Sequence, residues 1–293
     1  MLLSQFFADV YRPLRLRGRS PETARLYACT VRAFARFLGH APTLDDLADE
    51  LTLARFVDDR TSTRSPYTAE KERTQLMALA RLANERRMIP GLPSCPPVVL
   101  PDRIATAWSA DEMRRLYTAA ASTPGTVAGV PAGLWWSSLV RCAWESGERI
   151  GALLEVRHEH YARPDLAIPG EIRKGGRRGR VYELTAGACD QLDGLLAAHQ
   201  GPAVWPWPHA HTYVWDRMRK ILSRAGLARR RVAFHQIRRS AISHFAAVGG
   251  EAAAVSFAGH ANASTTRRWY IDPRLVDRGP RPGDLLPPIT AAG

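Results

Sequence analysis

Residues 234–270 read FHQIRRSAISHFAAVGGEAAAVSFAGHANASTTRRWY and carry most of the information about the architecture of the chain. His235 stands three positions before Arg238, so on a helix the imidazole and the guanidinium project from one face and can meet one ligand. Farther on come Ala258-Gly259-His260 and then Tyr270, at the end of a basic run. This order of hydrogen-bonding, cationic and phenolic side chains suits the binding and attack of a phosphate ester.

Two segments upstream add cations to this set. Arg149 follows Ser146-Gly147-Glu148, and Lys174 begins the turn-rich segment KGGRRG. A guanidinium fork is permanently charged and binds two phosphate oxygens at once, so Arg149 and Arg238 are expected to stabilise the reacting phosphate. Taken singly, each arginine is more simply explained as a surface or ion-paired residue, but the pair in this context is not. Lys174 differs because lysine can give up a proton near neutral pH, and the chain has only three lysines beside 38 arginines.

Together, these segments resemble the catalytic set of the tyrosine recombinases, the family of site-specific recombinases that includes the phage integrases. The family pattern is an arginine after a TG-like pair, a hairpin lysine, an HxxR, an LGH-like motif and a tyrosine after paired threonines, here Thr265-Thr266. By this resemblance, Tyr270 attacks a DNA phosphodiester and forms a 3′-phosphotyrosyl link with release of a 5′-hydroxyl, without metal, ATP or any other cofactor. The catalytic residues that it implies are Arg149, Lys174, His235, Arg238, His260 and Tyr270.

The resemblance also assigns a part to individual side chains. His235 assists proton transfer and holds the phosphate, His260 contacts the phosphate, and Lys174 protonates the expelled 5′-oxygen; simple backbone binding is the alternative for the lysine. A phenol has an ordinary pKa of about 10, so Tyr270 needs cationic surroundings and a proton acceptor. The neighbours expected to bind DNA are Arg173, Arg177, Arg178, Arg180, Arg239, Arg267 and Arg268. Structural hydrogen bonds are the simpler expectation for His158, His160, His209, His211 and His244.

Two positions depart from the family pattern. Nine residues lie between His260 and Tyr270, one more than in the commonest spacing, so Trp269 occupies the usual place of the nucleophile. An indole cannot serve as the nucleophile, and a helix or loop register shifts easily by one residue, so Tyr270 remains the predicted residue. The family commonly has an acidic residue three places after the first arginine, whereas this chain has Ala152 there and Glu148 before the arginine. Which residue holds Arg149 in place is therefore left open.

The composition favours a nucleic-acid partner. The formal net charge is +13 and the isoelectric point is about 10.3, and cations placed against phosphates release condensed counterions. The alternative is a basic but unspecialised surface.

Hydrophobic residues make up 45% of the chain, enough for one large core or two smaller ones. Four separated cysteines suggest neither zinc nor disulfides, and without a recognisable leader or membrane span we expect a cytoplasmic protein, nucleoid-associated when bound to DNA.

The pattern of elements predicts a mainly α, α+β chain with one small antiparallel hairpin. Residues 1–97 have helical periodicity and resemble the SAM-like core-binding domain of the family, which binds DNA. A proline-rich stretch predicts a linker at 98–105, and 106–293 are expected to form the catalytic domain. There we expect a helix after Arg149, helices over 134–146, 189–196, 211–225 and 235–248, and strands over 166–168 and 181–184.

Capping residues mark the expected helix starts. Ser20 and Ser65 each precede a proline, and helices are expected to begin at these prolines. In the second domain, Ser109 or Asp111 is expected to cap a new helix. About the last 20 residues are rich in proline and are predicted to be irregular.

Duplex DNA is the predicted partner, and no membrane is expected. The resemblance implies that the two domains clamp the duplex and that four protomers form a homotetramer on two recombination sites. The chain starts at the core-binding domain, so the arm-binding domain of some phage integrases is expected to be missing. Two other functions stay open: a catalytically silent DNA-binding regulator with this fold, and a type IB topoisomerase-like enzyme. One sequence reveals neither the target site nor the choice between integration, mobile-element transfer and dimer resolution.

Overall fold

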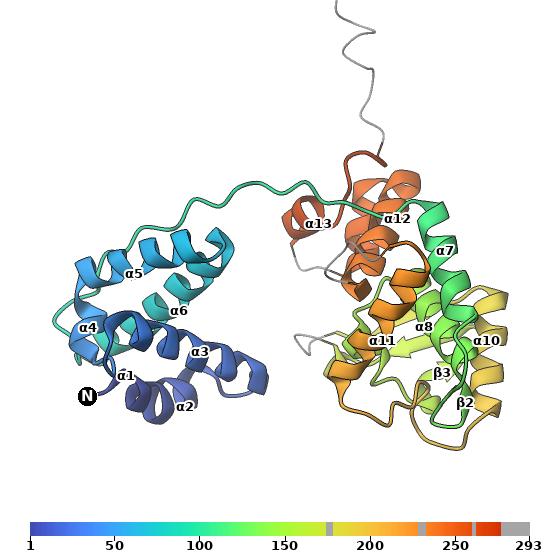
Figure 1. Cartoon of the computed structure of the whole chain (residues 1–293), viewed down its shortest axis with the longest axis horizontal. Helices are drawn as coiled ribbons and strands as arrows, with labels where there is room; N and C mark the ends of the chain where they lie inside the picture. Colours follow the sequence, from blue (N-terminus) through green and yellow to red (C-terminus); the bar gives the residue numbers. More distant parts are fainter. Residues whose placement is uncertain (174–177, 228–232, 260–261, 277–293) are drawn as a thin grey trace, which may run out of the picture. The chain divides into compact units, whose positions relative to one another are not determined.

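The computed structural model describes residues 1–173, 178–227, 233–259 and 262–276 (Figure 1). The chain divides into two compact units, Met1–Asp102 and Arg103–Gly293. The division falls within the stretch predicted to be a linker. Helices dominate both units, and the strands of the second form small antiparallel sheets. The predicted mainly α, α+β class is therefore confirmed.

The first unit is a group of helices around an aromatic core. Its elements are α1 (Leu3–Gln5), η1 (Phe6–Tyr11, a π-helix), α2 (Arg12–Arg15), α3 (Pro21–Leu38), α4 (Leu44–Ala48), α5 (Glu50–Thr63) and α6 (Pro66–Glu85). Both α3 and α6 begin at the predicted prolines, and the Ser65 hydroxyl caps α6 by accepting the Thr68 N–H at 3.3 Å. Phe34 and Phe56 are fully buried and meet edge to face, with ring centroids 5.1 Å apart.

The second unit combines helices with short strands. Its elements are α7 (Ala110–Ala121), β1 (Thr126–Val127), β2 (Val130–Pro131), α8 (Ala132–Ser146), α9 (Ile150–Leu153), η2 (His158–His160, a 3₁₀ turn), β3 (Tyr161–Ala162), β4 (Asp165–Ile168), η3 (Gly170–Ile172, a 3₁₀ turn), β5 (Arg180–Glu183), α10 (Ala186–Ala197), α11 (His211–Arg224), α12 (Ala233–Ala258) and α13 (Ala263–Trp269). The largely buried helix α8 packs against α7, α10 and α12 and forms the centre of the unit (Figure 1).

The predicted hairpin is present, and a third strand joins it. β4 pairs antiparallel with β5, with Leu166 opposite Tyr182 and Ile168 opposite Arg180. β3 pairs with the other edge of β4. This strand was not predicted, because its two residues are too few to show an alternating pattern. Leu166 and Ile168 are fully buried, so one face of the sheet packs on the core.

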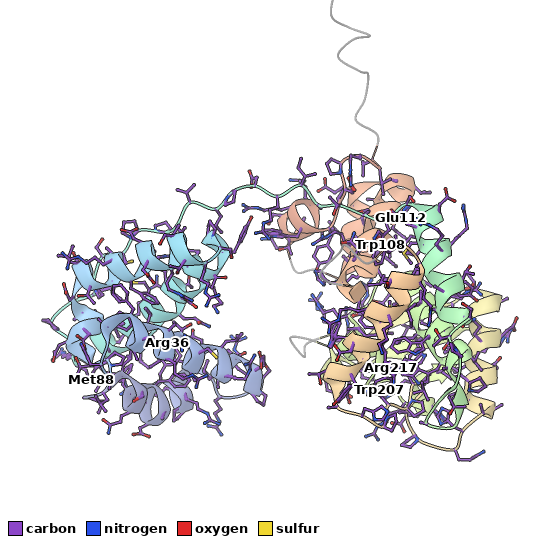
Figure 2. All side chains as sticks on the ribbon, in the orientation of Figure 1. Arg36, Met88, Trp108, Glu112, Trp207 and Arg217 are labelled. Atoms are coloured by element: carbon purple, nitrogen blue, oxygen red, sulfur yellow. The ribbon has the colours of Figure 1, made fainter. Side chains whose placement is uncertain are left out.

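Ser109 rather than Asp111 caps α7. Its hydroxyl accepts the Glu112 N–H at 3.2 Å, and the Glu112 carboxylate accepts the Ser109 N–H at 2.8 Å, which is a reciprocal capping box. Trp108, labelled with Glu112 in Figure 2, is fully buried just before this cap. Its main-chain N–H donates to Ser240 Oγ at 2.7 Å, which fastens the start of the second unit to α12.

The helix α12 extends past the predicted 235–248 and breaks at Gly250, where φ is 79° and ψ is 171°. Phe234–Ala258 is long and apolar enough to cross a membrane by length and composition alone, which the sequence had not led us to expect. Arg238, near the start of this stretch, is 1% exposed and is held within the unit. A buried charge and a broken axis are features of a core helix, and we interpret α12 as one.

Gly133, in α8, lies against the end of α7 with no room for a side chain. A Cβ there would lie 2.1 Å from the Ala121 carbonyl oxygen, a main-chain atom that cannot move alone. We expect Gly133→Ala to lower the free energy of unfolding by about 1–3 kcal/mol. In the control Gly194→Ala, in α10, the new Cβ would lie 3.8 Å from Leu134 Cδ2, and stability should rise by roughly 0.5–1 kcal/mol. Urea unfolding measures both changes, and equal effects would contradict this packing.

Candidate active site

Tyr270 lies in a cluster of cationic and hydrogen-bonding groups. It is 6% exposed. Its ring meets the His235 ring edge to face, with centroids 5.2 Å apart, and the Arg238 guanidinium carbon lies 5.3 Å from its centroid. Trp269 is instead part-buried, with the Arg268 guanidinium 5.1 Å from its ring. Of these two neighbouring aromatic residues, it is Tyr270 that faces the predicted catalytic side chains.

Hydrogen bonds to main-chain carbonyls fix this register. Although α13 ends at Trp269, the Tyr270 N–H still donates to the Thr266 carbonyl at 3.0 Å. From α12, Arg239 Nε donates to the Trp269 carbonyl at 3.0 Å, and Ser243 Oγ donates to the Tyr270 carbonyl at 2.5 Å. Two side chains of α12 thus hold consecutive carbonyls of the Tyr270 segment, so the HxxR helix sets which aromatic side chain turns inward.

Arg238 is a buried cation at the centre of the cluster. Its Nη1 donates to the Gly147 carbonyl, and its Nη2 donates to the Ala258 carbonyl at 2.8 Å. Burial, followed by repulsion from the Arg149 guanidinium, lowers the pKa of Arg238, although Tyr270 acts in the opposite direction. A guanidinium still keeps its proton at neutral pH. Two like charges held close together favour an anion as the ligand of this site.

The turn that precedes Arg149 requires a glycine. Gly147 ends α8 with a φ of +59°, and a Cβ there would lie 2.7 Å from the Phe257 ring. Arg149 follows in an extended conformation as the N-cap of α9. Because Arg238 donates to the carbonyl of the same turn, Gly147 brings the two arginines together.

Glu148, inside this turn, is a fully buried carboxylate. Its Oε1 accepts the Tyr182 hydroxyl at 2.8 Å and pairs with Arg173 Nη2. Its Oε2 accepts the Arg149 N–H at 3.0 Å and lies 4.0 Å from Arg238 Nη1. Burial raises the pKa of Glu148. The hydrogen-bond donors and the two guanidinium groups together lower it by more, so its pKa lies below the ordinary value. Glu148 is therefore ionised at neutral pH.

Lys174, Arg177 and His260 lie outside the described residues, but residues next to two of them meet at this site. Arg173, which precedes Lys174, pairs with the buried carboxylate. Gly259, which precedes His260, has a φ of +62°, and a Cβ there would lie 3.1 Å from Arg173 Nη2. The residues before the lysine and before the histidine thus lie against each other.

Solved structures share this arrangement of elements. The chain is similar to a lambda integrase tetramer bound to a Holliday junction, with a TM-score of 0.71, 19% identity and coverage of 96% of this chain and 79% of that chain. It is also similar to the XerH site-specific recombinase bound to a palindromic difH substrate, with a TM-score of 0.69, 17% identity and coverage of 88% of this chain and 79% of that chain. A third similar structure is the Tn1549 transposon integrase in complex with circular intermediate DNA, with a TM-score of 0.70, 11% identity and coverage of 92% of this chain and 95% of that chain. This chain has the tyrosine recombinase fold. No protein-family model and no curated protein matches it.

Within the recombinase fold, the arginines predicted to bind DNA occupy two kinds of place. Three make hydrogen bonds or ion pairs inside the unit: Arg173, Arg180 and Arg239. Three have exposed side chains: Arg178, Arg267 and Arg268. Arg180 Nη1, for example, donates to the Phe257 carbonyl at 2.8 Å, whereas Arg267 forms an exposed ion pair with Glu251. The exposed group can reach a DNA backbone without breaking a buried contact.

Sequence reasoning missed several residues that hold the site of this recombinase fold: Glu148 as a buried partner, Tyr182, Ser243 and Asp272. Tyr182 stands opposite Leu166, which is fully buried, so strand alternation would have placed it inside but not at the site. The other contacts join segments far apart in the chain, and no local pattern marks them. Over the described ranges, no group of three or more His, Cys, Asp or Glu side chains is arranged to hold a metal ion.

Asp272, two residues after Tyr270, ties this segment to the start of the second unit. It is 1% exposed, its Oδ2 accepts the Ala107 N–H at 2.7 Å, and its own N–H donates to Ser243 Oγ at 2.9 Å. Arg274 pairs with the same carboxylate at 2.5 Å. Burial raises the pKa of Asp272, but Arg274 and the Ala107 N–H lower it more, from 3.8 to about 2.

The lowered pKa of Asp272 predicts a window of pH-dependent stability. Because the folded-state pKa lies below the unfolded one, the ionised carboxylate stabilises the fold by roughly 2 kcal/mol above about pH 4, and this is lost between about pH 4 and 2. Asp272→Asn should therefore lower the melting temperature at neutral pH and differ less from wild type in acid. Asp190→Asn, which changes an exposed carboxylate paired with Arg163, is the control. A pH-independent difference would contradict this role.

Proposed function

We propose that this protein is a site-specific DNA recombinase that cleaves and rejoins duplex DNA with Tyr270 as its nucleophile. The observation that carries the proposal is the packing of the Tyr270 ring on His235 and Arg238, with Arg149 close enough to lower the pKa of Arg238. These side chains come from three separate stretches of the second unit. A phenol, an imidazole and two guanidinium groups together form a constellation suited to attack on a phosphate ester.

The two arginines would hold the reacting phosphate. Attack on a phosphodiester spreads negative charge over the two non-bridging oxygens, and Arg149 and Arg238 supply matching donors. Arg238 is held by the Gly147 and Ala258 carbonyls, so its position does not depend on the substrate. Donors that are already in place stabilise a transition state most effectively, because they need no reorganisation during the reaction.

In the cleavage step, a bond forms between Tyr270 Oη and phosphorus, and the bond between phosphorus and the 5′-oxygen breaks. The phenolic proton leaves to a nearby base, for which His235, in contact with the ring, is the candidate. The expelled 5′-oxygen takes a proton, and we assign its delivery to Lys174 and further phosphate contact to His260. Attack by a 5′-hydroxyl on the phosphotyrosine reverses these changes. The phosphoester is conserved throughout, so rejoining requires no ATP.

We further propose that the protein acts in the cytoplasm on duplex DNA, as a homotetramer on two recombination sites. The net charge of +13 supports a DNA partner. The likeness to a lambda integrase tetramer on a Holliday junction supports four protomers as the working assembly.

Covalent trapping tests the nucleophile. On nicked duplexes made from inverted repeats next to the gene, wild-type protein should form an adduct that survives denaturing electrophoresis. Tyr270→Phe should form none, because the attacking oxygen is gone, whereas Trp269→Phe should still form it. A wild-type protein that binds this DNA without an adduct would be a regulator, and an adduct formed by Tyr270→Phe would place the nucleophile elsewhere.

Product topology separates recombination from DNA relaxation. A recombinase should convert a plasmid with two sites into deletion or inversion products. It should form no such products from a plasmid with one site. Relaxation of both plasmids, with no exchange between sites, would instead identify a topoisomerase-like enzyme.

Lysine substitutions test the phosphate contacts. Arg149→Lys and Arg238→Lys keep the charge but lose the planar fork, and we expect adduct formation at saturating DNA to slow by roughly 100-fold in each variant. Arg163→Lys, in an exposed ion pair with Asp190 and Asp193, is the control and should keep the wild-type rate. Single-turnover gels measure these rates, with melting temperatures as a check on folding. Wild-type rates in Arg149→Lys would contradict its assignment.

A further inference from the structure

The buried carboxylate of Glu148 joins two parts of the site that act on different atoms of the substrate. We propose that Glu148 is a positioning residue that holds the Arg149–Arg238 pair and the base of the β4–β5 hairpin in one arrangement. This inference rests on the proposed function, because it concerns the same reaction. It also accounts for the support of the first arginine, since Ala152, in α9, has no carboxylate to offer.

Each oxygen of Glu148 serves a different part of the site. Oε2 accepts the Arg149 N–H and faces Arg238 Nη1, so it is directed at the two phosphate-binding arginines. Oε1 accepts the Tyr182 hydroxyl from β5 and pairs with Arg173, which follows η3. A single carboxylate therefore fixes the distance between the arginine turn and the hairpin.

Arg173 extends this connection to Arg178, the next described residue of the hairpin. Its Nη2 pairs with Glu148, while its Nη1 donates to the Arg178 carbonyl at 2.9 Å. Arg173 and Arg178 stand on either side of the segment that contains Lys174. The guanidinium that Glu148 binds therefore holds Arg173 to Arg178 across this segment, and this is the basis on which we infer that loss of the carboxylate impairs the proposed proton donor.

Burial makes this connection sensitive to the charge of Glu148. The Glu148 side chain is fully buried, and those of Arg173 and Arg238 are 9% and 1% exposed. Water cannot replace a lost partner at such depth, so a buried guanidinium without its carboxylate is strongly unfavourable. Loss of the negative charge would leave mutual repulsion among the guanidinium groups, and the hairpin base and the arginine turn would move apart.

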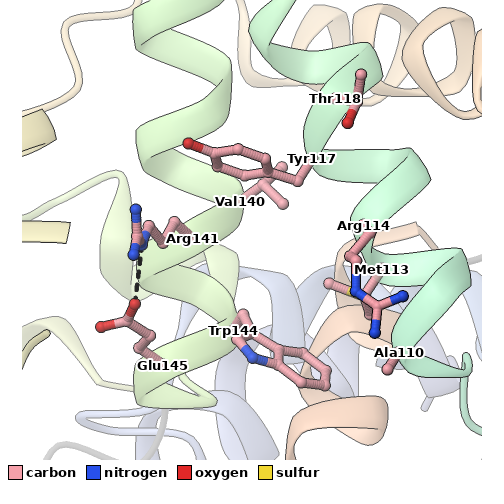
Figure 3. A pocket seen from close by; sticks show the side chains of 9 residues that line it. All are labelled: Ala110, Met113, Arg114, Tyr117, Thr118, Val140, Arg141, Trp144 and Glu145. Atoms are coloured by element: carbon pink, nitrogen blue, oxygen red, sulfur yellow. Dashed lines mark hydrogen bonds and ion pairs between the residues drawn. The ribbon is translucent and has the colours of Figure 1, made fainter. Parts of the chain in front are cut away.

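The first experiment replaces Glu148 and compares DNA binding with cleavage. With Glu148→Gln, we expect adduct formation at saturating nicked DNA to slow by up to roughly 100-fold, the effect of a misplacement of about 1 Å, while the dissociation constant for DNA stays near wild type. The matched control is Glu145→Gln. Glu145 accepts Arg141 Nε at 3.0 Å and the Thr185 N–H at 2.9 Å, neither of which is a residue of the proposed site, and Figure 3 shows its pairing with Arg141. This control should cleave at the wild-type rate.

The second experiment separates the two sides of the connection. In a duplex with sulfur in place of the bridging 5′-oxygen, the leaving group is a thiolate, which departs without a proton because a thiol has a far lower pKa than an alcohol. On this substrate, Lys174→Ala should regain most of its lost rate. Glu148→Gln should regain part of its lost rate, since the sulfur corrects only the misplaced proton donor. The remaining defect measures the displacement of the arginines.

Each outcome has a distinct meaning. If wild-type protein forms no adduct, the proposed function fails. If wild type cleaves and Glu148→Gln cleaves equally fast, Glu148 is no positioning residue. If the sulfur rescues Lys174→Ala but not Glu148→Gln, the carboxylate does not position the hairpin. Should Glu148→Gln fail to fold, Tyr182→Phe decides, because it removes a single hydrogen bond to Oε1: a smaller defect with partial sulfur rescue supports the proposal, and wild-type rates overturn it.

Discussion

The buried guanidinium of Arg238 is the constraint around which the second unit is organised. A cation with almost no access to water must find all its partners within the protein. The Gly147 and Ala258 carbonyls accept its N–H groups, the Glu148 carboxylate lies 4.0 Å away, and the Tyr270 ring covers it. These partners come from the end of α8, the end of α12 and the residue after α13, so satisfying one charge also fixes the relative positions of three helices.

Features that depend on local spacing could be predicted from the sequence. The shared face of His235 and Arg238 follows from a separation of three residues on a helix, and the β4–β5 hairpin follows from two apolar runs around a turn. Tyr270 was preferred to Trp269 because an indole is no nucleophile and a register shifts easily by one residue. In the structure, Arg239 and Ser243 of α12 hold the Trp269 and Tyr270 carbonyls at the end of α13, and no local pattern encodes such contacts between helices.

Contacts between distant segments could not be predicted. Glu148 meets Tyr182 only because the turn after α8 packs against β5, and each residue alone reads as an ordinary surface or strand residue. The sequence also does not distinguish arginines on the surface from arginines that make contacts inside the unit. Arg178 and Arg268 are exposed, whereas Arg180 and Arg239 hold main-chain carbonyls inside the unit. In so basic a chain, burial rather than composition separates arginines that hold the fold from those able to meet a polyanion.

The hydrogen bond between Ala107 and Asp272 ties the first residues of the second unit to almost the last described ones. This hydrogen bond indicates where the second unit can be truncated, which the order of its helices and strands does not. A fragment that starts after Ala107 removes a donor from a buried carboxylate, and one that stops before Arg274 removes its counter-ion. The smallest self-sufficient piece of the second unit must therefore contain both Ala107 and Arg274, although neither belongs to a regular helix or strand.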